Sequence, residues 1–381
     1  MAITSISGGE RNYAGDSGTA GPELTVVVPT LNEEGNIAEL TARLRQVLNG
    51  IAWEVIFVDD DSKDGTRAEI SRLAASDHRV RLLHRIGRRG LSSACIEGVQ
   101  ASTAPFVAVM DADLQHDESL LPKMLAAAKN ENQDLVIGSR YVSGGGVDDW
   151  DKGRANASMF ATRLGQAILR VNVADPMSGF FLLRRAAFDG AVRQLSAMGF
   201  KILVDLLAST KTPLRVRELP YHFRPRHAGA SKLDSQVAWE YIMLLADKTV
   251  GKFLPVRFVL FSIVGLIGLC AHLTVLGAAL KFGHLNFAVA QGTATMIAMV
   301  GNFSLNNWFT YSDRRLRGWG YIKGLLSFSA ICGIGAIANI GIASFLFSTE
   351  QQSWWFAGVA GAAMSSVWNY AVSSVITWKK T

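Results

Sequence analysis

The last third of the sequence contains four long apolar stretches without a single Asp, Glu, Lys or Arg. They run over residues 258–280, 287–305, 324–347 and 354–378. Each meets the length of about 18–20 apolar residues that a helix needs to cross a bilayer. Four buried helices of a soluble domain are the alternative. We therefore expect an all-α, four-helix transmembrane domain over residues 255–381.

The charges of the connecting loops predict how these spans are oriented. Lys and Arg gather before the first span, between the second and third, and after the fourth: Lys248, Lys252, Arg257, Arg314, Arg315, Arg317, Lys323, Lys379 and Lys380. The other two loops contain only Lys281 and Glu350. By the positive-inside rule we expect an integral membrane protein whose N-terminal domain, middle loop and C-terminus are cytoplasmic. Trp354, Trp355 and Trp378 suit the membrane interface.

The residues within the spans are typical of an anchor. Since the spans contain no charged residue, an ion-coupled transport pathway is not expected. Faces of small residues, such as Gly265 with Gly268 and Gly358 with Gly361, are candidates for helix association in a homo-oligomer.

The remainder of the chain has the composition of a flexible tail followed by a soluble domain. Over the whole sequence 49% of residues are hydrophobic and 18% are charged, which excludes a disordered or fibrous chain. Residues 1–22 contain five glycines among polar residues and no apolar core of a secretory signal, so we expect a flexible tail. Nothing in the sequence predicts a nucleic-acid partner.

Residues 23–233 alternate between two patterns. Short apolar runs of strand length cover residues 24–28, 55–58, 80–83, 106–110 and 135–137, and helical spacing covers 37–48 and 67–75. This alternation predicts an α/β domain with a mostly parallel sheet. Functional residues should then follow the carboxyl ends of the strands.

A linker over residues 234–254 joins the two domains. Val237, Tyr241, Leu244 and Leu245 recur at helical spacing, and basic residues follow them. This pattern predicts an amphipathic helix on the membrane surface or, equally, an ordinary packed helix.

The first two predicted strands both end in acidic residues. Pro29-Thr30-Leu31-Asn32-Glu33 follows the first, where a dinucleotide-binding fold would have a glycine-rich turn. Asp59-Asp60-Asp61 ends the second, and adjacent carboxylates repel one another unless cations or hydrogen-bond donors meet them. Ribose hydroxyls and base N–H groups are suitable donors. The alternative is a solvated turn in which Asp61 caps the next helix.

A third acidic motif, Asp111-Ala112-Asp113-Leu114-Gln115, follows the run 106–110. In an extended segment, residues two apart point the same way, so Asp111, Asp113 and Gln115 would present oxygen atoms to one side. Oxygen ligands without Cys or His suit Mg²⁺ or Mn²⁺, which can bridge a diphosphate. We interpret His116 as a neighbour of this site rather than a ligand.

Further motifs extend these patterns through the soluble domain. They are Gly90-Leu91-Ser92-Ser93-Ala94, Gly138-Ser139-Arg140-Tyr141, Asp175-Pro176-Met177-Ser178-Gly179-Phe180-Phe181, Gly199-Phe200-Lys201-Ile202-Leu203 and residues 226–233. With the acidic motifs, they resemble the GT-A (Rossmann-like) family-2 glycosyltransferases, and most of all the dolichol-phosphate (polyprenyl-phosphate) mannose synthases. The four-span domain is similar to the GtrA-like membrane domain fused to some of these synthases.

The resemblance implies a role for each matching position. The nucleoside would lie against Pro29, Leu31, Glu33, Val58 and Asp60. Asp111, Asp113 and Gln115 would hold Mg²⁺ or Mn²⁺ and the donor diphosphate, with Ala112 between them. Arg140, Arg226 and Lys232 match positions that contact phosphates, and Arg154 matches one that faces the acceptor phosphate. Asp113, Arg140 and Arg154 are the catalytic candidates. Relatives often carry Tyr where this chain has Leu31, so stacking against the base is lost.

The resemblance and the chemistry of the acceptor together predict the reaction. A lipid monophosphate has a second pKa of about 6, so it is already an anionic nucleophile near neutral pH and needs no general base. We expect the transfer of mannose from GDP-mannose to a polyprenyl (dolichyl-type) monophosphate in one metal-dependent displacement that inverts C1. The alternatives are another donor with a polyprenyl phosphate, such as UDP-glucose, and a lipid-sugar translocase or scaffold.

Overall fold

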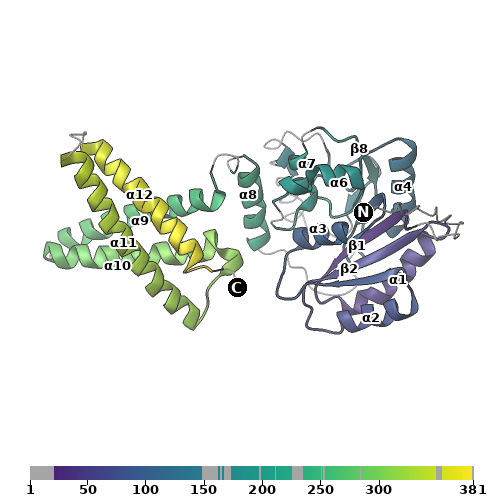
Figure 1. The fold of residues 1–381 in the computed structure, drawn as a ribbon, viewed down its shortest axis with the longest axis horizontal. Helices are drawn as coiled ribbons and strands as arrows, with labels where there is room; N and C mark the ends of the chain where they lie inside the picture. The colour runs from purple at the N-terminus through teal and green to yellow at the C-terminus, as the bar shows by residue number, and fades with distance from the viewer. Residues whose placement is uncertain are drawn as a thin grey trace, which may run out of the picture. The chain divides into compact units, whose positions relative to one another are not determined.

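The computed structural model describes residues 21–147, 162–163, 165–166, 173–196, 199–210, 212–224, 235–249, 251, 254–283, 285–348 and 354–379. The chain divides into two compact units, Met1–Leu245 and Ala246–Thr381, which Figure 1 shows as a mixed α/β unit and a helical unit. Almost all of the predicted tail, residues 1–20, lies outside the described residues.

The first unit is built on a seven-stranded sheet. Its strands are β1 (Leu24–Thr30), β2 (Trp53–Asp59), β3 (Val80–His84), β4 (Phe106–Val109), β5 (Leu135–Ser139), β7 (Phe181–Arg184) and β8 (Val216–Pro220). They lie in the order β3-β2-β1-β4-β7-β5-β8. All neighbours are parallel except β7, which runs antiparallel to β4 and β5. A separate pair joins β6 (Gly146–Val147) to β9 (His222–Phe223). The predicted α/β fold with a mostly parallel sheet is confirmed.

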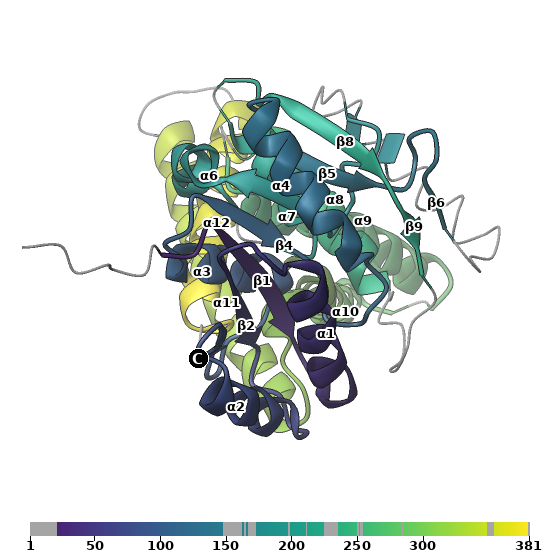
Figure 2. The ribbon, with the colours of Figure 1, turned by 90° about the vertical axis from the view of Figure 1, so that its right-hand side faces the viewer.

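Helices cover both faces of the sheet because alternate strand residues point to opposite sides. Val26 belongs to the core under α1 (Glu34–Val47), α2 (Thr66–Ser76) and α4 (Leu121–Asn130). Its neighbour Val27 belongs to the core under α3 (Leu91–Ala101), α6 (Arg185–Ala191) and α7 (Ile202–Ser209). Figure 2 shows α1 and α4 in front of the sheet. Burial on both faces explains the continuous apolar runs within β1 and β2, at residues 26–28 and 55–58.

Helix α8 (Ser235–Thr249) follows the sheet domain. Its residues Tyr241, Leu244 and Leu245 are buried in one cluster with Met177 and Val204. This apolar face is therefore covered by protein, as expected for a packed helix. A position of α8 at a membrane surface stays a prediction.

The second unit contains four long helices at the four predicted stretches. They are α9 (Val256–Lys281), α10 (Phe287–Leu305), α11 (Trp319–Ser348) and α12 (Trp354–Val375). Among the described residues, Val256–Lys281 and Trp319–Asn339 are long and apolar enough to span a membrane, with mean hydropathies of 2.3 and 1.6. Large apolar side chains on these helices, such as Leu266, Leu273 and Ile337, are exposed, as lipid-facing residues are.

Glycines on these helices pack against asparagines of the neighbouring helix. A side chain on Gly268 of α9 would overlap Asn302 of α10, and one on Gly361 of α12 would overlap Asn339 of α11. Gly268 and Gly361 are therefore occupied within the chain, and the prediction that they form oligomerisation faces is wrong for these two positions. Gly265 has no neighbour within 4 Å of such a side chain. The surroundings of Gly358 lie outside the described residues.

Trp378 is fully buried within the helical unit, so its ring contacts protein, and its predicted place at the membrane interface stays a prediction. Its ring stacks on Tyr311 at a centroid distance of 4.2 Å and on Phe303 at 5.5 Å. Its indole N–H donates to Asn307 Oδ1 at 3.1 Å. The tryptophan thus attaches the end of the chain to the turn between α10 and α11. The side chains of Trp354 and Trp355 lie outside the described residues.

Candidate active site

Strands β1, β2 and β4 bring the three acidic motifs to one edge of the sheet. β1 pairs in parallel with β2 on one side and β4 on the other, with Thr30 opposite Asp59 and Val27 opposite Val109. The segments that leave these strands at their carboxyl ends therefore lie side by side, the usual position of ligand sites in parallel sheets.

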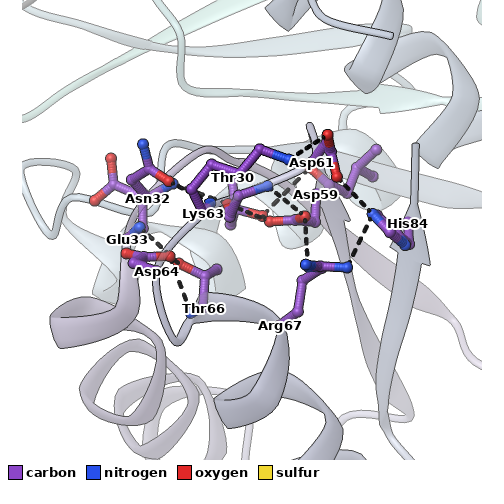
Figure 3. A network of polar contacts seen from close by, with 12 residues as sticks. Thr30, Asn32, Glu33, Asp59, Asp61, Lys63, Asp64, Thr66, Arg67 and His84 are labelled. Carbon is purple, nitrogen blue, oxygen red and sulfur yellow. Dashed lines mark hydrogen bonds and ion pairs between the residues drawn. The ribbon is translucent and has the colours of Figure 1, made fainter. Parts of the chain in front are cut away.

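The segments after β1 and β2 are hydrogen-bonded to each other (Figure 3). The backbone N–H of Asn32 donates to Ser62 Oγ at 2.9 Å, and that of Lys63 donates to Asn32 Oδ1 at 2.9 Å. The backbone N–H of Glu33 donates to Thr66 Oγ1 at 2.8 Å. Asn32 has a φ of 56°, in the left-handed region that Asn tolerates better than most residues. These bonds hold Glu33 next to the acidic end of β2.

All three adjacent carboxylates are bound within the protein, and Asp59 and Asp61 bind residues close to them in the sequence. Asp59 is buried and accepts from the backbone N–H of Ser62 at 3.0 Å, with Arg67 Nε 3.8 Å away. Asp61 pairs with Lys63 Nζ at 2.8 Å, and this bond lowers the pKa of Asp61. Arg67 and Lys63 thus offset the repulsion between these adjacent carboxylates. Asp61 does not cap the next helix, since Asp64 accepts from the N–H of Thr66 at 3.1 Å.

Asp60 is held by Arg85, a residue that the sequence reasoning missed. Arg85 is 2% exposed and donates from Nη1 to Asp60 Oδ1 and from Nη2 to Ser93 Oγ at 2.6 Å. The other oxygen of Asp60 accepts from the backbone N–H of Gly90 at 2.7 Å. Burial raises the pKa of Asp60 and outweighs these bonds. The available signal was the position of Arg85 directly after β3, where functional residues are expected.

The segment 111–115 is a tight bend, so the extended geometry assumed from the sequence is wrong. Leu114 has a φ of 62°, which reverses the chain. Asp113 is buried and its Oδ1 accepts from the backbone N–H of Gln115 at 3.2 Å, whereas the Asp111 side chain is 36% exposed. The amide of Gln115 donates to the carbonyl of Arg224 at 2.9 Å. The bend still gathers two carboxylates and an amide near the end of β4.

His116 stabilises this bend through a hydrogen bond to the backbone of Asp111. Its Nδ1 accepts from the backbone N–H of Asp111 at 3.1 Å, and its ring stacks on Phe180 at 5.1 Å. Burial lowers the pKa of His116 to about 4, so the ring is neutral at neutral pH and carries its proton on Nε2. Nε2 lies 3.8 Å from Asp111 Oδ2. His116 therefore orients Asp111, in agreement with its interpretation as a neighbour.

Arg140 forms a two-pronged ion pair with Asp175. Its Nε and Nη2 each lie 2.8 Å from a different oxygen of this fully buried carboxylate. Burial alone would lower the pKa of Arg140, but the bonds to Asp175 raise it, so the charge is permanent. The Arg140 guanidinium, which was predicted to contact a phosphate, is thus already paired with a protein carboxylate. Lys201 also interacts electrostatically with Asp111, Asp175 and Arg140, and burial lowers the pKa of Lys201 to about 8.

Comparisons with known proteins agree with the predicted family and with its two domains. Residues 25–190 match glycosyl transferase family 2, and residues 260–378 match the GtrA/DPMS transmembrane domain. A dolichol-phosphate mannosyltransferase of Pyrococcus furiosus is 33% identical over 358 residues, which cover 93% of this chain and 99% of the relative. The chain belongs to glycosyl transferase family 2. The dolichol-phosphate mannosyltransferase of Saccharomyces cerevisiae is 35% identical over 248 residues, which cover 63% of this glycosyltransferase and 91% of the yeast protein.

Two solved structures of another enzyme are distantly similar to this glycosyltransferase. Glucosyl-3-phosphoglycerate synthase from Mycobacterium tuberculosis, in complex with phosphoglyceric acid, has a TM-score of 0.47 at 20% identity, covering 60% of this chain and 80% of that one. The same synthase with Mn²⁺, UDP-glucose and phosphoglyceric acid has a TM-score of 0.46 at 20% identity, covering 62% and 85%. At these TM-scores neither structure carries an argument about this chain.

Several residues of this glycosyltransferase that were predicted to contact the donor or the acceptor differ from the acidic residues in their burial, or lie outside the described residues. Val58 and Ala112 are buried in the core, so their side chains do not face solvent, while Pro29 and Leu31 are half-buried at the end of β1. Arg154, Arg226 and Lys232 lie outside the described residues, so their phosphate contacts stay predictions.

The described part of the glycosyltransferase contains no cluster of three or more His, Cys, Asp or Glu that could hold a metal. The oxygens of Asp111, Asp113 and Gln115 nevertheless fit Mg²⁺ or Mn²⁺, because both ions accept a few carboxylates completed by an amide, water and phosphate. Gly179 leaves room beside them, since a side chain there would lie 3.2 Å from Asp111 Oδ2.

Proposed function

We propose that this glycosyltransferase transfers mannose from GDP-mannose to a polyprenyl monophosphate of the dolichyl type, giving a β-linked polyprenyl-phosphate mannose. The observation that carries this proposal is the match to a dolichol-phosphate mannosyltransferase along 93% of the chain, through both the catalytic and the helical domain. A relative that shared only the catalytic domain would support sugar transfer but not a membrane lipid as the acceptor.

The nucleoside would bind at the ends of β1 and β2. Pro29 and Leu31 offer half-buried apolar surface there, and Glu33 is held against the segment that follows β2 by the bond from its backbone N–H to Thr66. Asp60 keeps lone pairs for ribose or base donors, although Arg85 and Gly90 already donate to it. Buried acceptors of fixed orientation favour a base with matching N–H groups, and guanine has such groups.

Asp111, Asp113 and Gln115 would hold a divalent metal together with the donor diphosphate. When bound, such an ion neutralises negative charge on the diphosphate and makes the nucleotide a better leaving group. The protein's own contribution is a fixed bend: His116 holds the backbone of Asp111, and Arg224 holds the amide of Gln115.

The acceptor needs orientation more than activation. Its phosphate oxygen would form the new bond to C1 as the bond between C1 and the donor diphosphate breaks, and the electron pair leaves with the nucleoside diphosphate. Attack from the opposite face inverts C1, and the second pKa of about 6 makes a proton-abstracting residue unnecessary. Arg154, Arg226 and Lys232 are the cations assigned to these phosphates. By the positive-inside rule, the loop charges favour the cytoplasmic face as the side of the membrane where this reaction occurs.

A transfer assay with several donors tests the proposal. The purified full chain is mixed with a polyprenyl phosphate and with GDP-mannose or UDP-glucose, with Mg²⁺, Mn²⁺ or EDTA. We expect mannolipid and free GDP, a β-anomeric signal by NMR, and no product in EDTA. Transfer from UDP-glucose alone would replace the donor in this proposal. If donor binds but no nucleoside diphosphate is released, the translocase or scaffold alternative is correct.

A further inference from the structure

The turn between α10 and α11 is a rigid structure at one end of the helical unit. The side chain of Asn307, which is 1% exposed, accepts from the backbone N–H of Leu316 at 2.8 Å and donates to its carbonyl at 3.1 Å. The same side chain accepts from the indole N–H of Trp378 at 3.1 Å. The turn is thus fixed to itself and to the end of the chain.

Two of the basic residues near this turn, Arg257 and Arg314, form ion pairs with Asp313. The Asp313 carboxylate lies 2.8 Å from Arg257 Nη2 and 3.5 Å from Arg314 Nε. Arg314 also donates to the carbonyl of Trp378 at 3.1 Å. Asp313 is the only acidic residue between positions 306 and 323, so its charge is already shared by these two arginines.

Three further cations are exposed on this turn and in the first part of α11. Arg315 and Arg317 are exposed on either side of Leu316, which packs against the aromatic cluster around Phe303. Lys323 is exposed one turn into α11. Within the described residues these three cations have no ion pair, so their charge faces outward without compensation.

Two exposed indole rings accompany these cations. The guanidinium of Arg315 lies 4.9 Å from the ring centroid of Trp308, which is 56% exposed, and Trp319 is 79% exposed. Exposed tryptophans beside Lys and Arg at the end of apolar helices are typical of the bilayer interface, where anionic lipid headgroups attract basic side chains.

We propose that Arg315, Arg317, Lys323 and Trp308 form a binding site for the phosphate headgroup of an anionic bilayer phospholipid. The fixed turn carries the two exposed arginines next to the packed Leu316, and the Trp308 ring lies against the guanidinium of Arg315. The proposal does not depend on the proposed donor or acceptor of the sugar-transfer reaction.

Native mass spectrometry of the full chain in detergent tests this site, with phosphatidylglycerol as the probe and phosphatidylcholine as the neutral comparison. The double variant Arg315→Gln/Arg317→Gln should bind phosphatidylglycerol about tenfold more weakly than the unchanged protein. Lys281→Gln is the matched control, because Lys281 is also an exposed cation over an exposed ring, 5.7 Å from the centroid of Phe282, at the other end of α9. It should leave the affinity within about twofold.

Three results would overturn the assignment. Equal phosphatidylglycerol affinity in the double variant would show that the arginines do not bind the headgroup. Equal binding of phosphatidylcholine and phosphatidylglycerol by the unchanged protein would show that the headgroup charge is not recognised. Displacement of phosphatidylglycerol by equimolar polyprenyl phosphate would identify the occupant as the acceptor lipid instead.

Discussion

Replacing Asp175 by Asn should destabilise the catalytic domain strongly. Asp175 is fully buried and Arg140 has a side chain only 9% exposed, and two 2.8 Å bonds join them. The substitution removes the negative charge but keeps the shape, so a guanidinium stays buried without its counter-charge. Breaking a buried pair in this way costs about 3–5 kcal/mol.

The protein contains an exposed pair of the same geometry that serves as a control. Arg215 donates from Nε and Nη2 to the two oxygens of Asp134 at 2.9 and 2.7 Å, but its side chain is 52% exposed. Water can replace the lost partner there, so Asp134→Asn should cost at most about 1 kcal/mol. The difference between the two variants isolates the effect of burial.

Thermal unfolding of the full chain in detergent measures both costs. Asp175→Asn should lower the Tm by about 6–15 °C and Asp134→Asn by less than about 4 °C. The double variant Asp175→Asn/Arg140→Met should be less destabilised than the sum of the single changes, since it leaves no unpaired charge. If Asp175→Asn and Asp134→Asn shift the Tm equally, the pair is not energetically buried and the reasoning is refuted.

Three further predictions follow from the site and the helices. Asp113→Ala should abolish metal-dependent transfer while donor binding in EDTA stays measurable by calorimetry, and near-normal turnover would contradict its assignment as a metal ligand. His116 has a folded-state pKa of about 4, below its ordinary 6.5, so it contributes about 3 kcal/mol to the free energy of unfolding above pH 6.5, and this contribution is lost as the pH falls toward 4. His116→Phe should therefore flatten this part of the pH profile of the Tm. An unchanged profile would assign the pH dependence to other groups. Gly268→Val should lower the Tm because its side chain would overlap Asn302, whereas Gly265→Val, which meets no neighbour, should not; equal effects would argue against close packing of α9 and α10.

The local patterns of the sequence were sufficient for the fold class, but they did not predict strands β7 and β8 or the strand order. Apolar runs of three to five residues became parallel strands, because a strand buried on both faces favours apolar side chains on both sides. The four uncharged stretches form the four long helices, as their length and apolar composition predict for membrane-spanning segments. The positions of Glu33, Asp60 and Asp111 at strand ends followed from the same patterns, since parallel strands bring their carboxyl ends to one edge.

Only the tertiary structure decided which charges meet. Arg85 and Asp60 are 25 residues apart, and Arg140 and Asp175 are 35 apart, so no local spacing indicates either pair. The burial of Trp378 against Tyr311 and the packing of Asn302 against Gly268 likewise depend on chain segments far apart in the sequence. Secondary structure follows from short-range periodicity, whereas the partner of a charged or aromatic side chain depends on how distant segments pack, and that information is spread over the whole chain.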